Sequence, residues 1–91
     1  MTKHVNITVT GNVQKVGFRF AAIAEALELG LVGIIKNYEE NQVKIEVEGE
    51  IDQLKIFLRW CHIGPKDAVV EKVDYESLEE LKNYETFSAE Y

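Results

Sequence analysis

A short glycine-containing loop, residues 11–17, carries residue types that could bind an anion. Its successive backbone amides can curl into a concave surface around a phosphate, and a helix beginning directly after it would add further free amides. Arg19 follows the loop closely, and its planar guanidinium matches two phosphate oxygens at once. Each feature also occurs in loops that are only structural. Together they indicate an anion site where the loop enters a helix.

The segments on either side of this loop have the patterns needed to hold it. Residues 4–9 alternate polar and apolar side chains, which is typical of a strand with one buried face. After the loop, apolar residues recur with helical spacing, and Gly30 stands where such a helix would end. The predicted apolar stripe of this helix consists of Phe20, Ile23, Ala24 and Leu27.

The rest of the chain supplies a second helix and the remaining strands. We predict strands over 31–38 and 43–47 joined by a polar turn, a helix from about Ile51 that Gly64-Pro65 ends, and strands over 69–75 and 87–91. The order βαββαβ with an added strand predicts an α+β fold, a ferredoxin-like two-layer sandwich with both helices on one face of an antiparallel sheet. The pairing of the fifth strand stays open. Because this fold hosts many unrelated activities, the function has to be argued from the site.

Length and charge limit the classes of protein to consider. The 91 residues suffice for one domain, residues 1–91, and their formal net charge of −6 argues against general nucleic-acid binding. Residues 1–38 nevertheless carry a net charge of +2 and residues 39–91 a net charge of −8, so positive charge gathers around the loop. A single cysteine, no signal-peptide pattern and no apolar segment of membrane-spanning length predict a cytoplasmic protein.

Two motifs resemble the signatures of the acylphosphatase family. The stretch from Gly11 to Arg19 is similar to the first signature, which has a glycine, Val-Gln, a small residue, Val, any residue and then Phe-Arg. The stretch Gly33-Ile34-Ile35-Lys36-Asn37 resembles the second, which begins with glycine and ends in a basic residue and asparagine. Further matching positions are Gly64, Pro65, Ala68, Val70, Phe87 and Tyr91. The resemblance runs from about Val5 to the C-terminus and agrees with a ferredoxin-like fold.

The resemblance implies hydrolysis of acyl phosphates to a carboxylate and inorganic phosphate, without a metal or cofactor. It assigns phosphate binding to Arg19 together with the loop amides, and orientation of the attacking water to Asn37. The amides concerned belong to Gln14, Lys15, Val16, Gly17 and Phe18. These roles suit phosphoryl transfer, which depends on charge stabilisation and in-line placement of the nucleophile. We expect an acyl phosphate as substrate, inorganic phosphate as product and inhibitor, no nucleic-acid or membrane partner, and a monomer.

The sequence departs from the family pattern in three places. Lys15 stands where the family usually has glycine, so a positive φ there would strain the loop by roughly 1 kcal/mol or more. Ile34 stands where an aromatic residue is common, which bears on how an acyl group would pack. Glu39-Glu40-Asn41 replaces the usual Asp-Gly turn, and we expect Asn41 to adopt the left-handed conformation that closes the hairpin.

Other functions compete with this interpretation. A phosphate-binding or regulatory module of the same fold would need the same loop without turnover. A single-stranded RNA-binding module shares the element order, but its aromatic motif must lie on a central strand, and residues 31–38 and 43–47 offer only Tyr38. A domain of a larger carbamoyl-transfer enzyme would also resemble an acylphosphatase.

The remaining residues that could do chemistry are expected to be structural. Cys61 and His62 are neighbours on a helix and therefore diverge around its axis, so they do not form a nucleophile–base pair. We expect Cys61 to be a buried thiol, His4 and His62 to be surface residues, and Trp60 to cover the edge of the core. No spacing of histidine, cysteine and acidic residues indicates a metal site.

Overall fold

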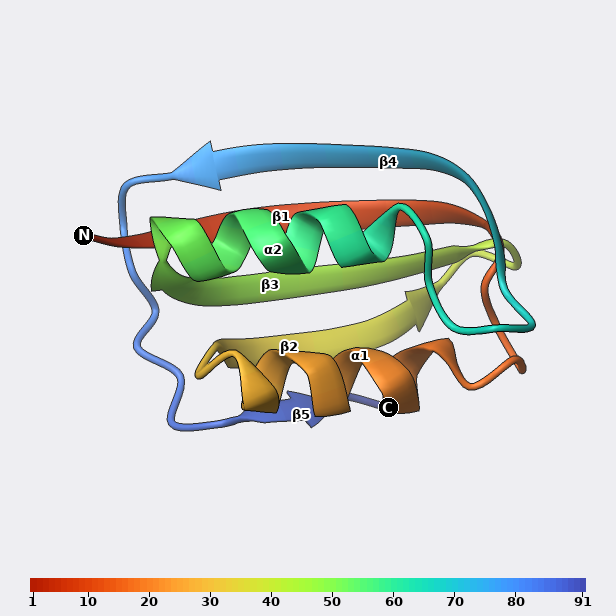
Figure 1. Cartoon of the computed structure of the whole chain (residues 1–91), viewed down its shortest axis with the longest axis horizontal. Helices are drawn as coiled ribbons and strands as arrows, with labels where there is room; N and C mark the ends of the chain where they lie inside the picture. Colours follow the sequence, from red (N-terminus) through yellow and green to blue (C-terminus); the bar gives the residue numbers. More distant parts are fainter.

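The computed structural model describes residues 1–91 and has two layers, a five-stranded sheet and two helices on one of its faces (Figure 1). The elements in chain order are β1 (Thr2–Asn12), α1 (Phe18–Glu28), β2 (Val32–Tyr38), β3 (Gln42–Glu50), α2 (Ile51–Cys61), β4 (Val69–Leu78) and β5 (Phe87–Ala89). This confirms the predicted α+β ferredoxin-like arrangement. Neither helix is long and apolar enough to cross a membrane.

The sheet has the strand order β4-β1-β3-β2-β5, and its last pair corrects one prediction. The pairs among β1 to β4 are antiparallel as expected, but β5 runs parallel to β2, with Phe87 opposite Gly33. The reason is the direction of β4, which finishes at the same end of the sheet at which β2 begins. The connection over residues 79–86 crosses that end of the sheet, so β5 starts beside the start of β2 and runs in the same direction (Figure 1).

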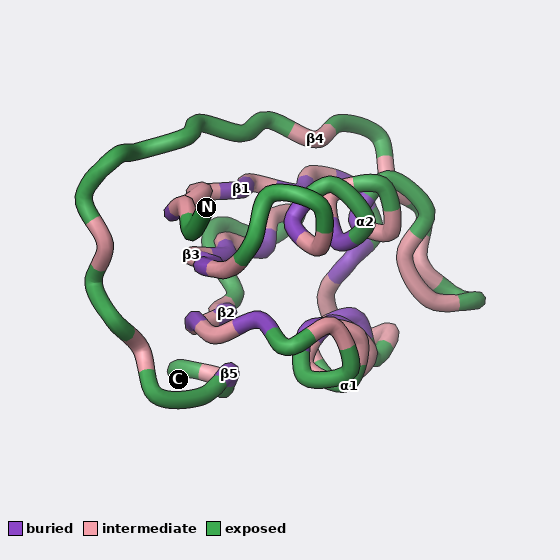
Figure 2. Tube along the Cα trace, turned by 60° about the vertical axis from the view of Figure 1, so that its left-hand side comes forward, coloured by how far each residue is buried: buried purple, intermediate pink, exposed green.

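The core lies between the sheet and the helices, where buried residues gather on the inward sides of both layers (Figure 2). Helix α2 buries Leu54, Phe57 and Cys61. The stripe predicted for α1 is wrong, because Phe20 is 83% exposed and Leu27 is 51% exposed. The buried residues of α1 are Phe18, Ala22 and Ala26. This helix is apolar on most sides, so the spacing alone did not define its buried face, and its small alanines pack closely against the sheet.

Polar groups cover one end of the opposite, helix-free face. His4, predicted at the surface, is fully buried there, and its Nδ1 lies 2.7 Å from Oε2 of the buried Glu48. The backbone amides of Lys82 and Asn83 donate to the same carboxylate, and the Tyr84 hydroxyl donates to Glu46. The connection between β4 and β5 therefore lies over His4 and is held by carboxylates of β3. This burial depends on a contact between residues far apart in the chain, which local alternation does not reveal.

Candidate active site

The anion site predicted at the start of α1 has the backbone that such a site needs. Gly17 precedes the helix in the left-handed conformation (φ 77°), and no side chain caps the free amides of the first turn. The first turn also holds no acidic residue that would repel an anion. Uncapped amides and the helix dipole together favour a negatively charged group at this position.

Lys15 lies in the same loop with a φ of 62°, which is the left-handed region. Side chains with a Cβ are disfavoured there, so the strain anticipated from the sequence applies to this lysine. Its exposed side chain adds a positive charge at the rim of the loop. The left-handed residues at 15 and 17 turn the chain sharply, as in backbone concavities that bind anions.

Gln14 holds the loop against the hairpin between β2 and β3. Its side-chain amide donates to the backbone carbonyls of Tyr38, Glu39 and Gln42, the last at 2.8 Å. The hairpin itself differs from the prediction, because its left-handed residue is Glu39 (φ 46°) and not Asn41. Since both β2 and the loop are fixed at this point, the end of β2 lies beside the start of α1.

One hollow brings most of the predicted site residues together. A cavity of about 190 Å³ is lined by Lys15, Gly17, Phe18, Arg19 and Asn37, together with other residues of the loop, α1 and the chain end. Arg19 and Asn37 also line an adjoining hollow of about 300 Å³. Gln14 and Val16 line neither hollow; the side chain of Gln14 binds the hairpin, and Val16 packs against the core.

The C-terminal residues complete this site, which the sequence analysis did not anticipate. The Arg19 guanidinium carbon lies 4.9 Å from the centroid of the Tyr91 ring, and Glu90 Oε1 lies 3.7 Å from Lys36 Nζ. Glu90 and Tyr91 directly follow β5, whose parallel pairing with β2 carries the chain toward Asn37. Tyr91 is among the positions that match the family pattern, but the order of elements leaves the pairing of β5 undetermined, and with it the place of Glu90 and Tyr91.

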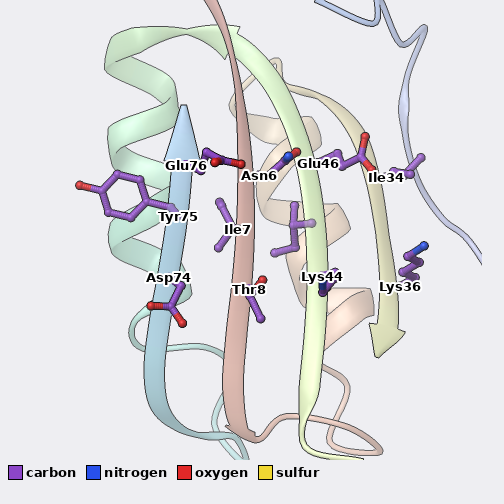
Figure 3. Close-up of a pocket in the computed structure, with 11 residues that line it drawn as sticks. Asn6, Ile7, Thr8, Ile34, Lys36, Lys44, Glu46, Asp74, Tyr75 and Glu76 are labelled. Carbon is purple, nitrogen blue, oxygen red and sulfur yellow. The ribbon is translucent and has the colours of Figure 1, made fainter. Parts of the chain in front are cut away.

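A larger hollow, of about 470 Å³, lies on the helix-free face of the sheet (Figure 3). Ile34 lines it, so this residue faces away from Asn37 and does not contact the candidate site. Its charged residues are of both signs, with the acids Glu46, Asp74 and Glu76 facing the same hollow as two lysines. Such a mixture of charges is poorly suited to a phosphate. The two hollows at Arg19 are lined together by three cations, Lys15, Arg19 and Lys36, and by one acid, Glu90.

Comparison with known proteins places the chain in a family. A family model described as acylphosphatase matches residues 5–89. The chain belongs to the acylphosphatase family. It is 42% identical over 83 residues to an acylphosphatase of Trichormus variabilis, covering 89% of this chain and 82% of that relative. The crystal structure of acylphosphatase from Bacillus subtilis is similar over 100% of both chains, with a TM-score of 0.95 and 31% identity.

A third comparison concerns a much longer protein. The structure of full-length HypF in its phosphate- and nucleotide-bound form matches with a TM-score of 0.91 and 29% identity, covering 100% of this chain but only 12% of that one. The fold therefore also occurs as a small part of a larger protein. Together with the other comparisons, family membership confirms the predicted fold and the predicted class of enzyme, an acyl phosphate hydrolase.

The other chemically active side chains lie elsewhere. Cys61 is fully buried, and burial, reinforced by the charge of Glu25, raises the pKa of its thiol far above the ordinary value. The neighbouring His62 uses its Nδ1 on the carbonyl of Leu58, at 3.0 Å. The two side chains therefore form no catalytic pair. No group of three or more histidine, cysteine, aspartate or glutamate side chains is arranged as a metal site.

Proposed function

We propose that the chain hydrolyses acyl phosphates in the hollow at the start of α1, with Arg19 and Asn37 as its catalytic residues. The observation that carries this assignment is that both residues line the same hollow, beside an uncapped helix N-terminus. Arg19 comes from the first signature and Asn37 from the second, so two segments distant in the chain meet at one point.

The phosphate group of the substrate binds at the loop. The amides of residues 14–18 and the first turn of α1 donate to its oxygens, and Arg19 supplies the balancing positive charge. These donors are fixed before the substrate arrives, because Gln14 holds the loop against the hairpin. Fixed donors stabilise the charge that spreads over the phosphoryl oxygens in the transition state.

Asn37 orients the water that attacks the phosphorus atom. Its amide oxygen accepts one hydrogen bond from the water, and its amide nitrogen donates to a phosphate oxygen or to the water. The amide is not a base at neutral pH, so the proton of the water passes to the substrate phosphate. The leaving group is a carboxylate whose acid has a pKa of about 4, and it departs without a proton donor.

No step in this scheme requires a metal or cofactor, and inorganic phosphate, the product, competes for the same amides and Arg19. Lys15 acts as an accessory cation at the rim. The acyl group lies toward the open mouth of the hollow, which Tyr91 and Phe20 border.

The test is hydrolysis of benzoyl phosphate in the presence of EDTA by the wild type, Arg19→Ala and Asn37→Ala. The matched controls are Arg59→Ala, an exposed arginine of α2, and Asn41→Ala, an exposed asparagine outside both hollows. We expect the wild type and controls to be active with EDTA and the two site variants to be severely impaired. Phosphate binding without any turnover by the wild type would instead identify a regulatory phosphate-binding module.

A further inference from the structure

A separate apolar groove lies between α2 and the edge strand β4. It has a volume of about 270 Å³ and shares no lining residue with the hollows at Arg19. Its apolar walls are formed by Val5, Ile7, Val47, Ile51, Leu54, Leu58 and Tyr75. The groove exists because α2 packs mainly on β3 and β1, which leaves the inner face of β4 uncovered (Figure 1).

Several of these apolar side chains remain in contact with water. Tyr75 is 61% exposed and Ile51 is 37% exposed, whereas the neighbouring Leu54 is buried. A ligand chain in the groove would remove this apolar surface from water, which is the main source of affinity for apolar ligands. Ligand sites have this composition, with mostly apolar walls and a few polar groups that fix orientation.

The polar groups of the groove are positively charged. Lys3 lies on β1 and Lys55 on α2, and both line the groove. Neither takes part in an ion pair, although the chain has 16 acidic residues. No acidic side chain lines the groove. An apolar groove with two unpaired ammonium groups is complementary to a molecule with an apolar chain and an anionic head.

We propose that this groove binds a medium-chain aliphatic carboxylate, with its chain against Leu54, Leu58 and Tyr75 and its head near Lys3 and Lys55. At roughly 30 Å³ for each non-hydrogen atom, the volume share of one water molecule, the groove has room for a chain of about eight or nine non-hydrogen atoms. It contains no arginine, the side chain that would match two oxygens of a phosphate head. The two oxygens of a carboxylate head can each accept a hydrogen bond from one of the two lysine ammonium groups.

A second copy of the chain is a poorer occupant of this face. Each copy has a net charge of −6, and β4 exposes Glu71, Asp74 and Glu76, of which Asp74 and Glu76 face the helix-free side of the sheet. Pairing along β4 would bring these carboxylates of two copies together, and their repulsion opposes association.

The experiment is a titration of the full chain with sodium octanoate, followed by methyl and aromatic NMR in saturating inorganic phosphate. Phosphate occupies the site at Arg19, so octanoate bound there as a product analogue is suppressed. We expect saturable shifts for Ile51, Leu54, Leu58 and Tyr75. Lys3→Gln and Lys55→Gln should each raise the Kd by about two- to fivefold, as expected for exposed ion pairs, and Lys66→Gln should leave it unchanged.

Octylammonium, which has the same chain and the opposite charge, should bind at least several-fold more weakly than octanoate. Tyr75→Ala should weaken binding without loss of the folded state, because this side chain is largely exposed. The proposal is wrong if no saturable shift occurs, if octylammonium binds equally well, or if both lysine variants bind octanoate like the wild type. Shifts of the same methyl groups on concentrating the protein without octanoate would identify a second copy as the occupant and would also overturn it. None of these outcomes depends on hydrolysis of acyl phosphates.

Discussion

Arg19 and Tyr91 lie far apart in the chain but contact each other, with the guanidinium carbon 4.9 Å from the centroid of the tyrosine ring. The contact exists because β5 runs parallel to β2 and delivers the last residues to the hollow that holds Asn37. A ring in this position limits the orientations of a side chain that otherwise has several rotatable bonds. Tyr91 is thus a positioning residue for Arg19 in our account.

Replacing Tyr91 should therefore weaken phosphate binding moderately. Exposed cation–π contacts contribute about 0.5–1 kcal/mol, so Tyr91→Ala should raise the inhibition constant of inorganic phosphate by about two- to fivefold. Tyr91→Phe keeps the ring and should resemble the wild type. Competitive inhibition of benzoyl phosphate hydrolysis measures both variants, and equal constants for wild type and Tyr91→Ala would show that the contact does not position Arg19.

Lys15→Gly should stabilise the fold while weakening substrate binding only slightly. Glycine has no Cβ penalty at the φ of 62° that Lys15 adopts, and the expected gain is about 1 kcal/mol at most. The lost charge is exposed, so its attraction to phosphate is ~1 kcal/mol or less and KM should rise by less than about tenfold.

Lys15→Ala is the control that separates these two effects, because it loses the charge and keeps the Cβ. Thermal melting should place Lys15→Gly above both wild type and Lys15→Ala, and the rise in KM should shrink as salt is added. A fall in kcat of several orders of magnitude in Lys15→Gly would mean that the lysine contacts the transferring phosphoryl group.

Acid should loosen the connection that lies over His4. Burial opposes ionisation of Glu48, but the amides of Lys82 and Asn83 and the ring of His4 outweigh it and lower the pKa of Glu48 below 4.5. The folded state therefore holds the ionised carboxylate more tightly than the unfolded chain does. This stabilisation is complete above the unfolded pKa of about 4.5 and is lost as the pH falls through the lowered folded pKa.

Glu48→Gln should accordingly lower the free energy of unfolding at pH 7 by about 1–3 kcal/mol, the range for lost hydrogen bonds to a buried charged group. The difference from wild type should narrow below pH 4.5. Glu76→Gln, on exposed β4, is the matched control and should change little. Urea unfolding at pH 7 and at acid pH tests this, and a destabilisation that is independent of pH would contradict the role of the ionised carboxylate.

The sequence predicted those parts of the molecule that depend on local pattern. Alternation and helical spacing located every element, and the signatures placed Arg19 and Asn37 on segments that meet in one hollow. The misplaced face of α1 has a local cause, since Phe20 and Leu27 fit a helical stripe as well as Ala22 and Ala26 do.

The features that the sequence did not predict depend on contacts between distant segments. His4 is buried only because residues 82–84 cross over it, and Tyr91 reaches Arg19 only because β5 pairs with β2. The left-handed residue of the hairpin is Glu39, where a hydrogen bond from Gln14 holds the turn. The preference of asparagine for the left-handed conformation therefore did not decide which residue of the turn adopts it. Tertiary contacts of this kind leave no periodic signal in the chain.

The most direct test of the central claim compares phosphate affinity and turnover in Asn37→Ala. If Asn37 orients the water and Arg19 holds the phosphate, Asn37→Ala should bind inorganic phosphate nearly as the wild type does. Its kcat for benzoyl phosphate should fall by on the order of 10² or more, the scale for loss of one preorganised polar group. Arg19→Ala should lose phosphate affinity and turnover together. Normal turnover by Asn37→Ala, or loss of phosphate affinity equal to that of Arg19→Ala, would contradict the division of roles between these two residues.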